Sequence, residues 1–319
     1  MAYEYQVYID GDKEYFTWST DNDFIYTKRP VKKEFEFSKT LLDFLDLSPD
    51  DFYDLTDGVG KYMNGLYKQP AEKRDFAELK QVLDKLAEKH IYFKLLQFDW
   101  YDRIKKYSRD GEVDLKEVMW FRDIIDIPLT IITMQQKLNA IFEKVLNDMS
   151  PDIPFQAKMI NLKNSWNFHF EFTSLKTNFE MVNDNIFTET LHPERFEDIV
   201  EFFLRNILKK ELQFKVCKSC GKYFPATGHA NTEHCDRLFQ DTGKTCKEVG
   251  SLKMFQKKIN ENPEFKLYNR AYKTHFARIK YNRMTKEEFQ EWAEEAREKR
   301  DKVSAGKMSL EKYQEWLKK

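Results

Sequence analysis

The sequence predicts an α+β protein that is mainly helical, and three observations support this prediction. Gly and Pro are scarce, with 10 and 9 among 319 residues, so long helices meet few interruptions. Apolar residues make up 41% of the chain, which is enough to bury a sizeable core. Apolar residues recur at helical spacing in most segments, while a few short stretches alternate as strands do.

Two regions are predicted to form strands. Residues 3–9 and 14–18 alternate on either side of an Asp10-Gly11 turn, which is typical of a β-hairpin. A second alternating stretch predicts a strand with one aromatic face, followed by a further short strand. Its aromatic residues are Trp166, Phe168, Phe170 and Phe172.

The remaining periodic segments predict helices. Apolar residues with helical spacing occur in the segments 76–86, 138–145, 196–207, 252–259 and 265–282. Pro128 should interrupt the long apolar stretch before the second of these segments. Thr285 and Glu288 form a capping box that starts another helix, and Ser309 starts the last one.

The C-terminal region contains one internal repeat, at an offset of 24 residues. "MTKEEFQEW" (284–292) and "MSLEKYQEW" (308–316) match at their Met, hydroxyl, aromatic and Trp positions. Two copies are too few for a solenoid, so we interpret them as two capped helices with the same apolar stripe.

Charge is distributed unevenly along the chain. Residues 205–286 contain 19 Lys and Arg against 7 Asp and Glu, a net charge of +12, whereas the whole chain carries −1. A basic block beside an acidic body indicates a surface that faces a polyanion, or two parts of the protein that face each other. We predict an acidic N-terminal α+β domain (1–210), a small zinc-ribbon-like module (211–250) and a helical C-terminal extension with a basic helix (251–319).

The N-terminal sequence, MAYEYQVYIDGDKEYF, has no basic head followed by an apolar segment, so we expect no signal peptide. No stretch approaches the roughly 20 apolar residues that span a bilayer. We therefore expect a cytoplasmic protein that does not enter a membrane. In a reducing compartment, clustered cysteines hold metal more often than they form disulfides.

All the cysteines of the chain lie within 30 residues, and they predict a zinc site. Cys217 and Cys220 form a Cys-x-x-Cys knuckle with Gly221 directly after it, while ten residues separate Cys235 from Cys246. Four thiolates would complete the tetrahedral shell that zinc prefers and leave no position for water, so the zinc would be structural.

Three alternatives to four cysteine ligands remain. His229 or His234, which lie in the same segment, could replace a cysteine as a ligand. The Cys217–Cys220 pair could instead be a redox motif, although the βαβ context of such motifs is absent. The cysteines could also be ordinary buried residues.

The cysteine segment and the helices after it resemble known proteins. The stretches "CKSCGKYF", "HCDR", "TCKEVG" and "AYKTHFARIK…EEFQEWAEEAREKR" resemble an uncharacterised family of Gram-positive bacteria, a domain of unknown function. The segment also looks like a treble-clef or ribbon-type zinc module, and it is distantly similar to the Cys-Gly-Asn-Arg zinc fingers of bacterial transcription regulators. Cys246 is followed by Lys-Glu-Val and not by Gly-Asn-Arg, so DNA-reading residues do not carry over. The resemblance covers residues 214–319.

The helix predicted after the cysteine segment is strongly basic. Residues 265–286 contain no acidic side chain, and on a helix the aromatic residues Tyr268, Tyr272 and Phe276 share one face, which we expect to pack on the zinc module. The candidate phosphate contacts are Lys266, Arg270, Lys273, Arg278 and Lys280. The alternative is a solvated face that docks on an acidic protein or on the acidic N-terminal part.

Enzymatic motifs are missing from the sequence. It contains no Gly-x-Ser-x-Gly, no phosphate-binding glycine loop and no His-Glu-x-x-His, so we favour a protein without catalytic activity. The leading hypothesis is a zinc-containing nucleic-acid-binding protein, with DNA preferred over RNA. The alternatives are a protein-interaction module with structural zinc, and an enzyme whose N-terminal domain would have a polar pocket with shifted carboxyl pKa values.

Overall fold

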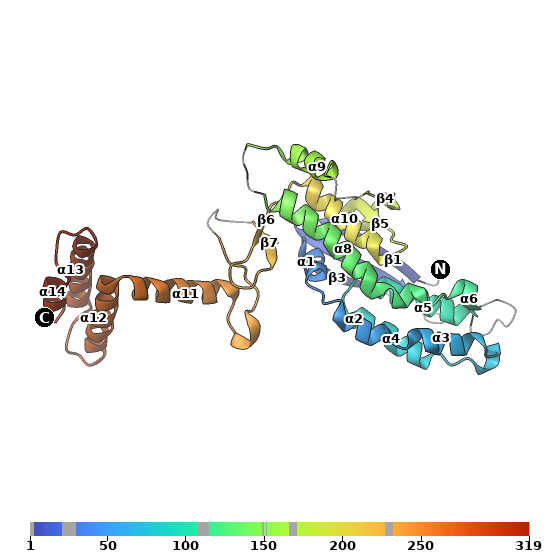
Figure 1. Ribbon diagram of the computed structural model, residues 1–319, viewed down its shortest axis with the longest axis horizontal. Helices are drawn as coiled ribbons and strands as arrows, with labels where there is room; N and C mark the ends of the chain where they lie inside the picture. Colours follow the sequence, from blue (N-terminus) through green and yellow to red (C-terminus); the bar gives the residue numbers. More distant parts are fainter. Residues whose placement is uncertain are drawn as a thin grey trace. The chain divides into compact units, whose positions relative to one another are not determined.

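The computed structural model describes residues 3–20, 30–107, 115–148, 150, 152–165, 171–226 and 232–318. The chain divides into two compact units (Figure 1). The N-terminal unit comprises residues 1–216 and 222–231, and the C-terminal unit comprises residues 217–221 and 232–319. The expected fold class, α+β and mainly helical, is confirmed.

An antiparallel five-stranded sheet lies in the N-terminal unit, with the order β3-β2-β1-β5-β4. Its strands are β1 Tyr3–Asp10, β2 Lys13–Thr20, β3 Val31–Glu36, β4 Thr177–Asn183 and β5 Ile186–Leu191. The predicted hairpin is confirmed as β1 and β2, in which Tyr8 pairs with Tyr15. Gly11 turns the chain with a φ of 58°, a conformation that a residue without a Cβ adopts readily.

Helices make up most of the rest of the N-terminal unit (Figure 1). They are α1 Lys39–Leu45, α2 Asp50–Thr56, α3 Val59–Tyr67, the 3-10 helix η1 Ala71–Lys73, α4 Ala77–Lys89, α5 Phe93–Tyr107, α6 Leu115–Val118, α7 Arg122–Ile125, α8 Ile127–Ile141, the π-helix η2 Phe142–Leu146, α9 Phe155–Lys163 and α10 Phe196–Lys209. The helices predicted in segments 76–86, 138–145 and 196–207 are thus confirmed. Pro128 lies in the first turn of α8, where its missing N–H costs nothing.

Aromatic side chains connect the sheet to the helices. The ring of Phe16 on β2 lies 6.0 Å from that of Tyr92 and 5.7 Å from that of Phe203 on α10, and all three are buried. Next to them, the buried carboxylate of Glu14 accepts hydrogen bonds from the backbone N–H and the hydroxyl of Thr40, at distances of 3.2 and 2.5 Å. The start of α1 is therefore fixed to β2 from within the core.

The predicted aromatic strand has no counterpart among the described residues. Trp166, Phe168 and Phe170 lie outside them, and Phe172 belongs to no strand. The observed strand in this region is β4, which begins at Thr177 and pairs with β5. The guanidinium of Arg205 lies over the Phe172 ring at 5.2 Å, so this ring packs against α10 and not on a sheet face.

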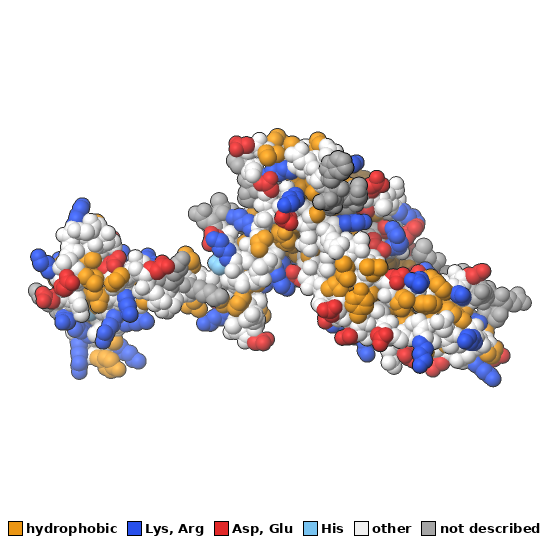
Figure 2. Space-filling view, in the orientation of Figure 1, with side chains coloured by type: hydrophobic (Ala, Val, Ile, Leu, Met, Phe, Trp, Pro, Cys, Tyr) orange, Lys and Arg blue, Asp and Glu red, His pale blue; other side chains and the backbone are white. Residues whose placement is uncertain are grey.

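The short strands β6 Phe214–Val216 and β7 Tyr223–Pro225 form an antiparallel hairpin. The helices of the C-terminal unit are the 3-10 helix η3 Gln240–Thr242, α11 Cys246–Glu261, α12 Pro263–Lys280, α13 Lys286–Ser304 and α14 Leu310–Trp316. Figure 2 shows Lys and Arg side chains gathered over α12. Of the helices in the described ranges, none is long and apolar enough to cross a membrane.

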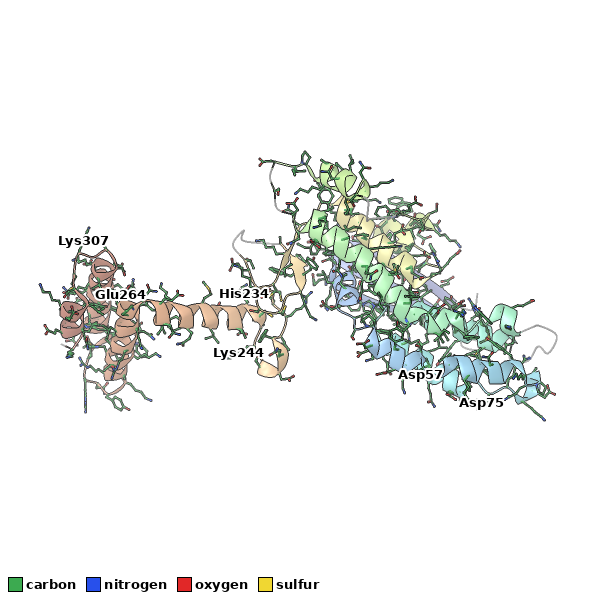
Figure 3. The ribbon with its side chains drawn as sticks, in the orientation of Figure 1. Asp57, Asp75, His234, Lys244, Glu264 and Lys307 are labelled. Atoms are coloured by element: carbon green, nitrogen blue, oxygen red, sulfur yellow. The ribbon has the colours of Figure 1, made fainter. Side chains whose placement is uncertain are left out.

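The repeated motif forms the contact between α13 and α14. Both copies begin with a capping hydroxyl, since Thr285 accepts from the backbone of Glu288, and Ser309 from that of Lys312. The equivalent tryptophans, Trp292 and Trp316, stack with their rings 6.3 Å apart. The repeat therefore reflects similar packing demands, as expected. A hydrogen bond from Ser304 to Glu264 (labelled in Figure 3) joins the end of α13 to the start of α12.

The aromatic face of α12 packs differently from our expectation. Tyr272 and Phe276 contact Phe289 on α13, with ring centroids 5.0 and 5.6 Å apart. The expectation that this face packs on the zinc module is therefore wrong for these two rings. The sequence favoured the module because it is adjacent in the chain, but Phe289 on α13 is the residue that these rings contact.

Candidate metal centre and basic helix

The Cys-x-x-Cys knuckle occupies the turn between β6 and β7. The backbone N–H of Gly221 donates to the carbonyl of Cys217 at 2.8 Å, which closes the turn. Gly221 has a φ of 75°, so the glycine after the second cysteine has the role that the sequence predicted. The closed turn directs Cys217 and Cys220 to one side of the hairpin.

A compact loop brings the other two cysteines together despite the ten residues between them. Leu238 and Thr245 form an antiparallel bridge, and the N–H of Phe239 donates to the carbonyl of Lys244 at 2.8 Å. Next to this bridge, the N–H of Lys247 donates to the carbonyl of Cys235 at 3.1 Å. Cys246 is the first residue of α11, just after the capping residue Thr245. The second pair is therefore a loop cysteine and a helix-start cysteine.

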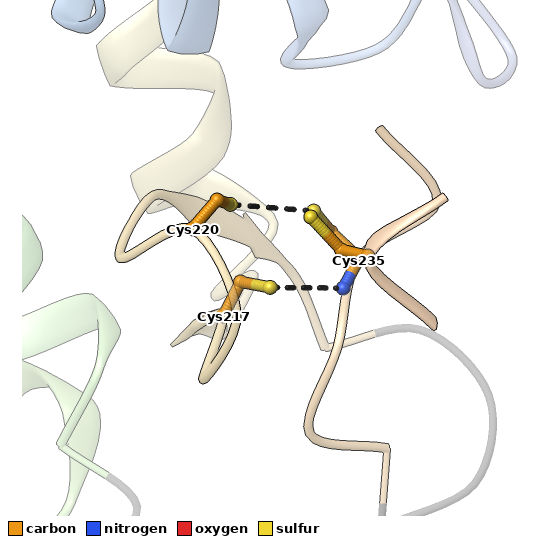
Figure 4. Close-up of side chains that lie close together, drawn as sticks. Cys217, Cys220 and Cys235 are labelled. Carbon is orange, nitrogen blue, oxygen red and sulfur yellow. Dashed lines mark hydrogen bonds between the residues drawn. The ribbon is translucent and has the colours of Figure 1, made fainter. Parts of the chain in front are cut away.

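The four cysteines predicted as ligands form one cluster. Their Sγ atoms all lie within 4.8 Å of one another, and the residues are Cys217, Cys220, Cys235 and Cys246. The Sγ atoms of Cys220 and Cys235 are 3.7 Å apart (Figure 4). Zn–S bonds of about 2.3 Å in a tetrahedron place neighbouring sulfurs about 3.8 Å apart, so the spacing fits a metal ion. The cluster could hold one metal ion.

The thiols of the cluster favour a bound cation. Burial opposes ionisation of Cys217, but backbone N–H groups of Cys235, Cys220 and Ser219 donate to its sulfur, and the net effect lowers its pKa to about 6. Burial raises the pKa values of Cys235 and Cys246, and the neighbouring sulfurs raise them further. A cation in the centre would remove the repulsion that keeps these two thiols protonated.

His234 lies beside the cluster without joining it. Its Nδ1 is 2.9 Å from the hydroxyl of Ser219, which in turn donates to the carbonyl of Cys246 at 3.2 Å. Its Nε2 faces Gly250 on α11, where a Cβ atom would lie only 2.4 Å away. Nδ1 is thus engaged by Ser219 and the ring lies close to the backbone of α11, so His234 is a supporting residue. His229 lies outside the described residues.

The arrangement leaves little room for chemistry at the metal. With four thiolate ligands a tetrahedral ion has no open position for water or substrate, so the cluster is suited to stabilising the fold. All four cysteines are free thiols, and three of them are buried. Sequence reasoning found the four clustered cysteines but missed Ser219 and Gly250, whose roles depend on the packing of the loop against α11.

The five predicted phosphate contacts all lie on α12. Lys266, Lys273 and Lys280 are seven residues apart, so they form one row with a spacing of about 10.5 Å along the helix. These lysines and Arg270 are exposed, while Arg278 is half-buried. Within the described part of the C-terminal unit, no ion pair involves any of the five. The positive charge of this face is therefore not neutralised inside its own unit.

A groove of about 330 Å³ lies between α12 and α14. Arg270 and Arg278 line one side and Lys318 the other, with Thr274 between them and no acidic residue in the lining. Sequence reasoning missed Lys318 and Thr274, because only the packing of α14 brings them beside the basic helix. The charged residues in the lining of the groove are therefore all cations.

The N-terminal unit contains a second polar region. Two cavities of about 430 and 530 Å³, between α5, α8 and the start of α10, share Asp126 and Glu197 in their linings. Burial raises the pKa values of Glu197 and of the nearby Asp123. Among the described lining residues no Cys, Ser or His occurs.

The four cysteines lie in the part of the chain that matches the model of a protein family. Residues 167–319 match the model of a family described as a family of unknown function (DUF6076). The match includes the four cysteines, α12 and the helices after it, and it starts earlier than the resemblance noted in the sequence. Neither the search of curated proteins nor that of solved structures found a match.

Proposed function

We propose that this protein is a zinc-containing, cytoplasmic nucleic-acid-binding protein with a regulatory role. One observation supports the proposal most: α12 exposes a row of cations that form no ion pair with any described carboxylate of their own unit. Each phosphate that such a cation neutralises releases counterions and adds a salt-dependent increment to binding. DNA is the preferred partner over RNA.

Zinc is the proposed metal, because four thiolates at tetrahedral spacing suit it better than harder cations. A knuckle on a hairpin combined with a ligand at a helix start suggests a treble-clef module and not a ribbon with two knuckles. In this role the ion fixes the start of α11, to which the basic helix is connected through residues 261–263. Native mass spectrometry should detect one zinc per chain, and a chain that purifies with four free thiols and no metal would refute this part.

A binding titration across a salt series tests the function. With a DNA duplex and an RNA of the same sequence, we expect measurable affinity at low salt that falls steeply as salt rises. Absence of binding to both at low salt, or an affinity that salt does not change, would contradict the proposal.

The alternative function is docking on an acidic protein surface, for which the same unneutralised row provides the attraction. A titration with an acidic polypeptide such as poly-glutamate separates the two. Tighter binding to this polymer than to DNA, at equal charge concentration, would favour the alternative.

A further inference from the structure

Two aromatic rings are exposed at the C-terminal end of α12. Phe276 is 58% exposed and Tyr281 is 68% exposed, whereas Phe289 and Tyr313 in the same unit are buried. The edge of Phe276 contacts Phe289, so the core of the unit holds the ring in place while much of it faces solvent. Exposed rings are common on this chain, but these two differ from the others in standing beside the exposed lysines of α12.

Cations surround these rings. Lys273 and Lys280 lie three residues before and four residues after Phe276, which places them beside it on the helix surface. Arg283, also exposed, follows Tyr281 by two residues. No acidic residue occurs in the segment 265–286. Within the segment 265–286, the charged neighbours of these rings are therefore all cations.

The turn after α12 is well defined. Asn282 adopts a φ of 52°, and the N–H of Arg283 donates to the carbonyl of Arg278 at 2.9 Å. This αL helix end fixes the backbone that carries Tyr281 and Arg283. Tyr281 and Arg283 thus lie on folded backbone that continues directly from α12.

A duplex offers phosphates to this surface but keeps its bases stacked inside. A single strand offers phosphates together with free base faces, which stack on aromatic side chains with little dependence on sequence. We propose that the end of α12 binds single-stranded nucleic acid, with the lysine row along the backbone and Phe276 and Tyr281 stacked on bases. The inference rests on the proposed function and specifies its ligand.

Fluorescence anisotropy with the full-length zinc-loaded protein tests the inference. The probes are oligo(dT), oligo(U) and a DNA duplex, each of about 15 nucleotides, which is close to the size of such sites. We expect the single strands to bind tighter than the duplex. Phe276→Ala and Tyr281→Ala should each weaken single-strand binding about 5- to 150-fold and leave duplex binding nearly unchanged.

Two controls make the result specific. Tyr281→Phe retains the ring, so it should bind single strands like the unmodified protein. Phe187→Ala removes a ring of similar exposure from the N-terminal unit and should have no effect. Tyr281 has the higher exposure of the two rings, and its replacement should leave the helical fold intact, as circular dichroism can verify.

The possible outcomes separate the inference from the proposed function. Salt-dependent binding that is equal for single strand and duplex, or that Tyr281→Ala leaves unchanged, would overturn the inference while the nucleic-acid function stands. Absence of binding to every probe at low salt would remove the function itself. Comparison of oligo(dT) with oligo(U) decides between DNA and RNA as the source of the strand.

Discussion

At the residue scale, the contact between His234 and Gly250 is the tightest constraint beside the cluster. A Cβ at position 250 would lie 2.4 Å from Nε2 of His234, which is closer than van der Waals contact allows. We therefore expect Gly250→Ala to displace the His234 ring from Ser219 and to destabilise the C-terminal unit by about 1–3 kcal/mol. Thermal unfolding of the zinc-loaded protein measures this effect.

Two matched variants identify the clash as the cause. Gly65 lies inside α3, where an added Cβ meets no atom within 4 Å, so Gly65→Ala should stabilise the protein by about 0.5–1 kcal/mol. In a His234→Ala background, Gly250→Ala should cost much less than it does alone. Equal costs in the two backgrounds would show that the ring contact is unimportant.

Glu14 and His90 give the N-terminal unit two opposing responses to pH. Burial raises the pKa of Glu14 to about 7 and lowers that of His90 to about 4. The folded state thus holds an extra proton on Glu14 between pH 4.5 and 7, so stability falls as pH rises. The unfolded state holds the extra proton on His90 between pH 4 and 6.5, so this residue makes stability rise with pH.

Single replacements should separate these two responses. Glu14→Gln removes the Glu14 contribution, so the free energy of unfolding should rise more with pH between 4.5 and 7 than it does in the unmodified protein. His90→Asn removes the opposite contribution, so stability should rise less with pH between 4 and 6.5 than in the unmodified protein. Urea unfolding at intervals across this range measures the slopes, and changes of the same sign in the two variants would contradict the assignment.

At the element scale, the capping box of α13 supports the surface on which α12 packs. Thr285 accepts a hydrogen bond from the N–H of Glu288, and the Glu288 carboxylate accepts one from the N–H of Thr285. Thr285→Ala should therefore destabilise the C-terminal unit by about 1 kcal/mol. Thr285→Asn, which keeps a capping oxygen, should lose much less, and chemical denaturation compares the two. A Thr285→Asn variant as unstable as Thr285→Ala would show that the cap contributes little.

Local sequence patterns predicted individual helices and turns well. They could not predict contacts between segments that are far apart in the chain. The Asp10-Gly11 turn and the Thr285 cap are local signals, because the residues that form them are neighbours in the chain. The pairing of β5 with β1 depends on the whole unit, so no local pattern could indicate it. The same limit explains why the ten-residue loop between Cys235 and Cys246 seemed irregular in sequence.

Some residues of the candidate site could likewise be predicted from local sequence, and others could not. The four cysteines could be found from composition alone, because reactive residues that are concentrated in one segment suggest shared ligation. The lysine row followed from helical periodicity. Lys318 and the partner of the α12 aromatic face could not be found, since both depend on how α13 and α14 fold back onto α12.

At the scale of the whole molecule, the uneven charge of the chain is its most informative property. The basic block of residues 205–286 includes the knuckle, α11 and α12, and the rest of the chain carries the compensating negative charge. An acidic remainder weakens the unspecific attraction of the whole chain to polyanions. We therefore propose that nucleic acid binds at the lysine row and that the net charge of the chain contributes little.

The most direct test of this claim is the salt dependence of DNA binding by a variant without the lysine row. Lys266, Lys273 and Lys280 are replaced together by Gln, and a control replaces Lys61, Lys73 and Lys85, three exposed lysines of the N-terminal unit, in the same way. We predict that the slope of log affinity against log salt falls by about 3 in the row variant and stays unchanged in the control. An unchanged slope in the row variant, or an equal loss in both, would contradict the account.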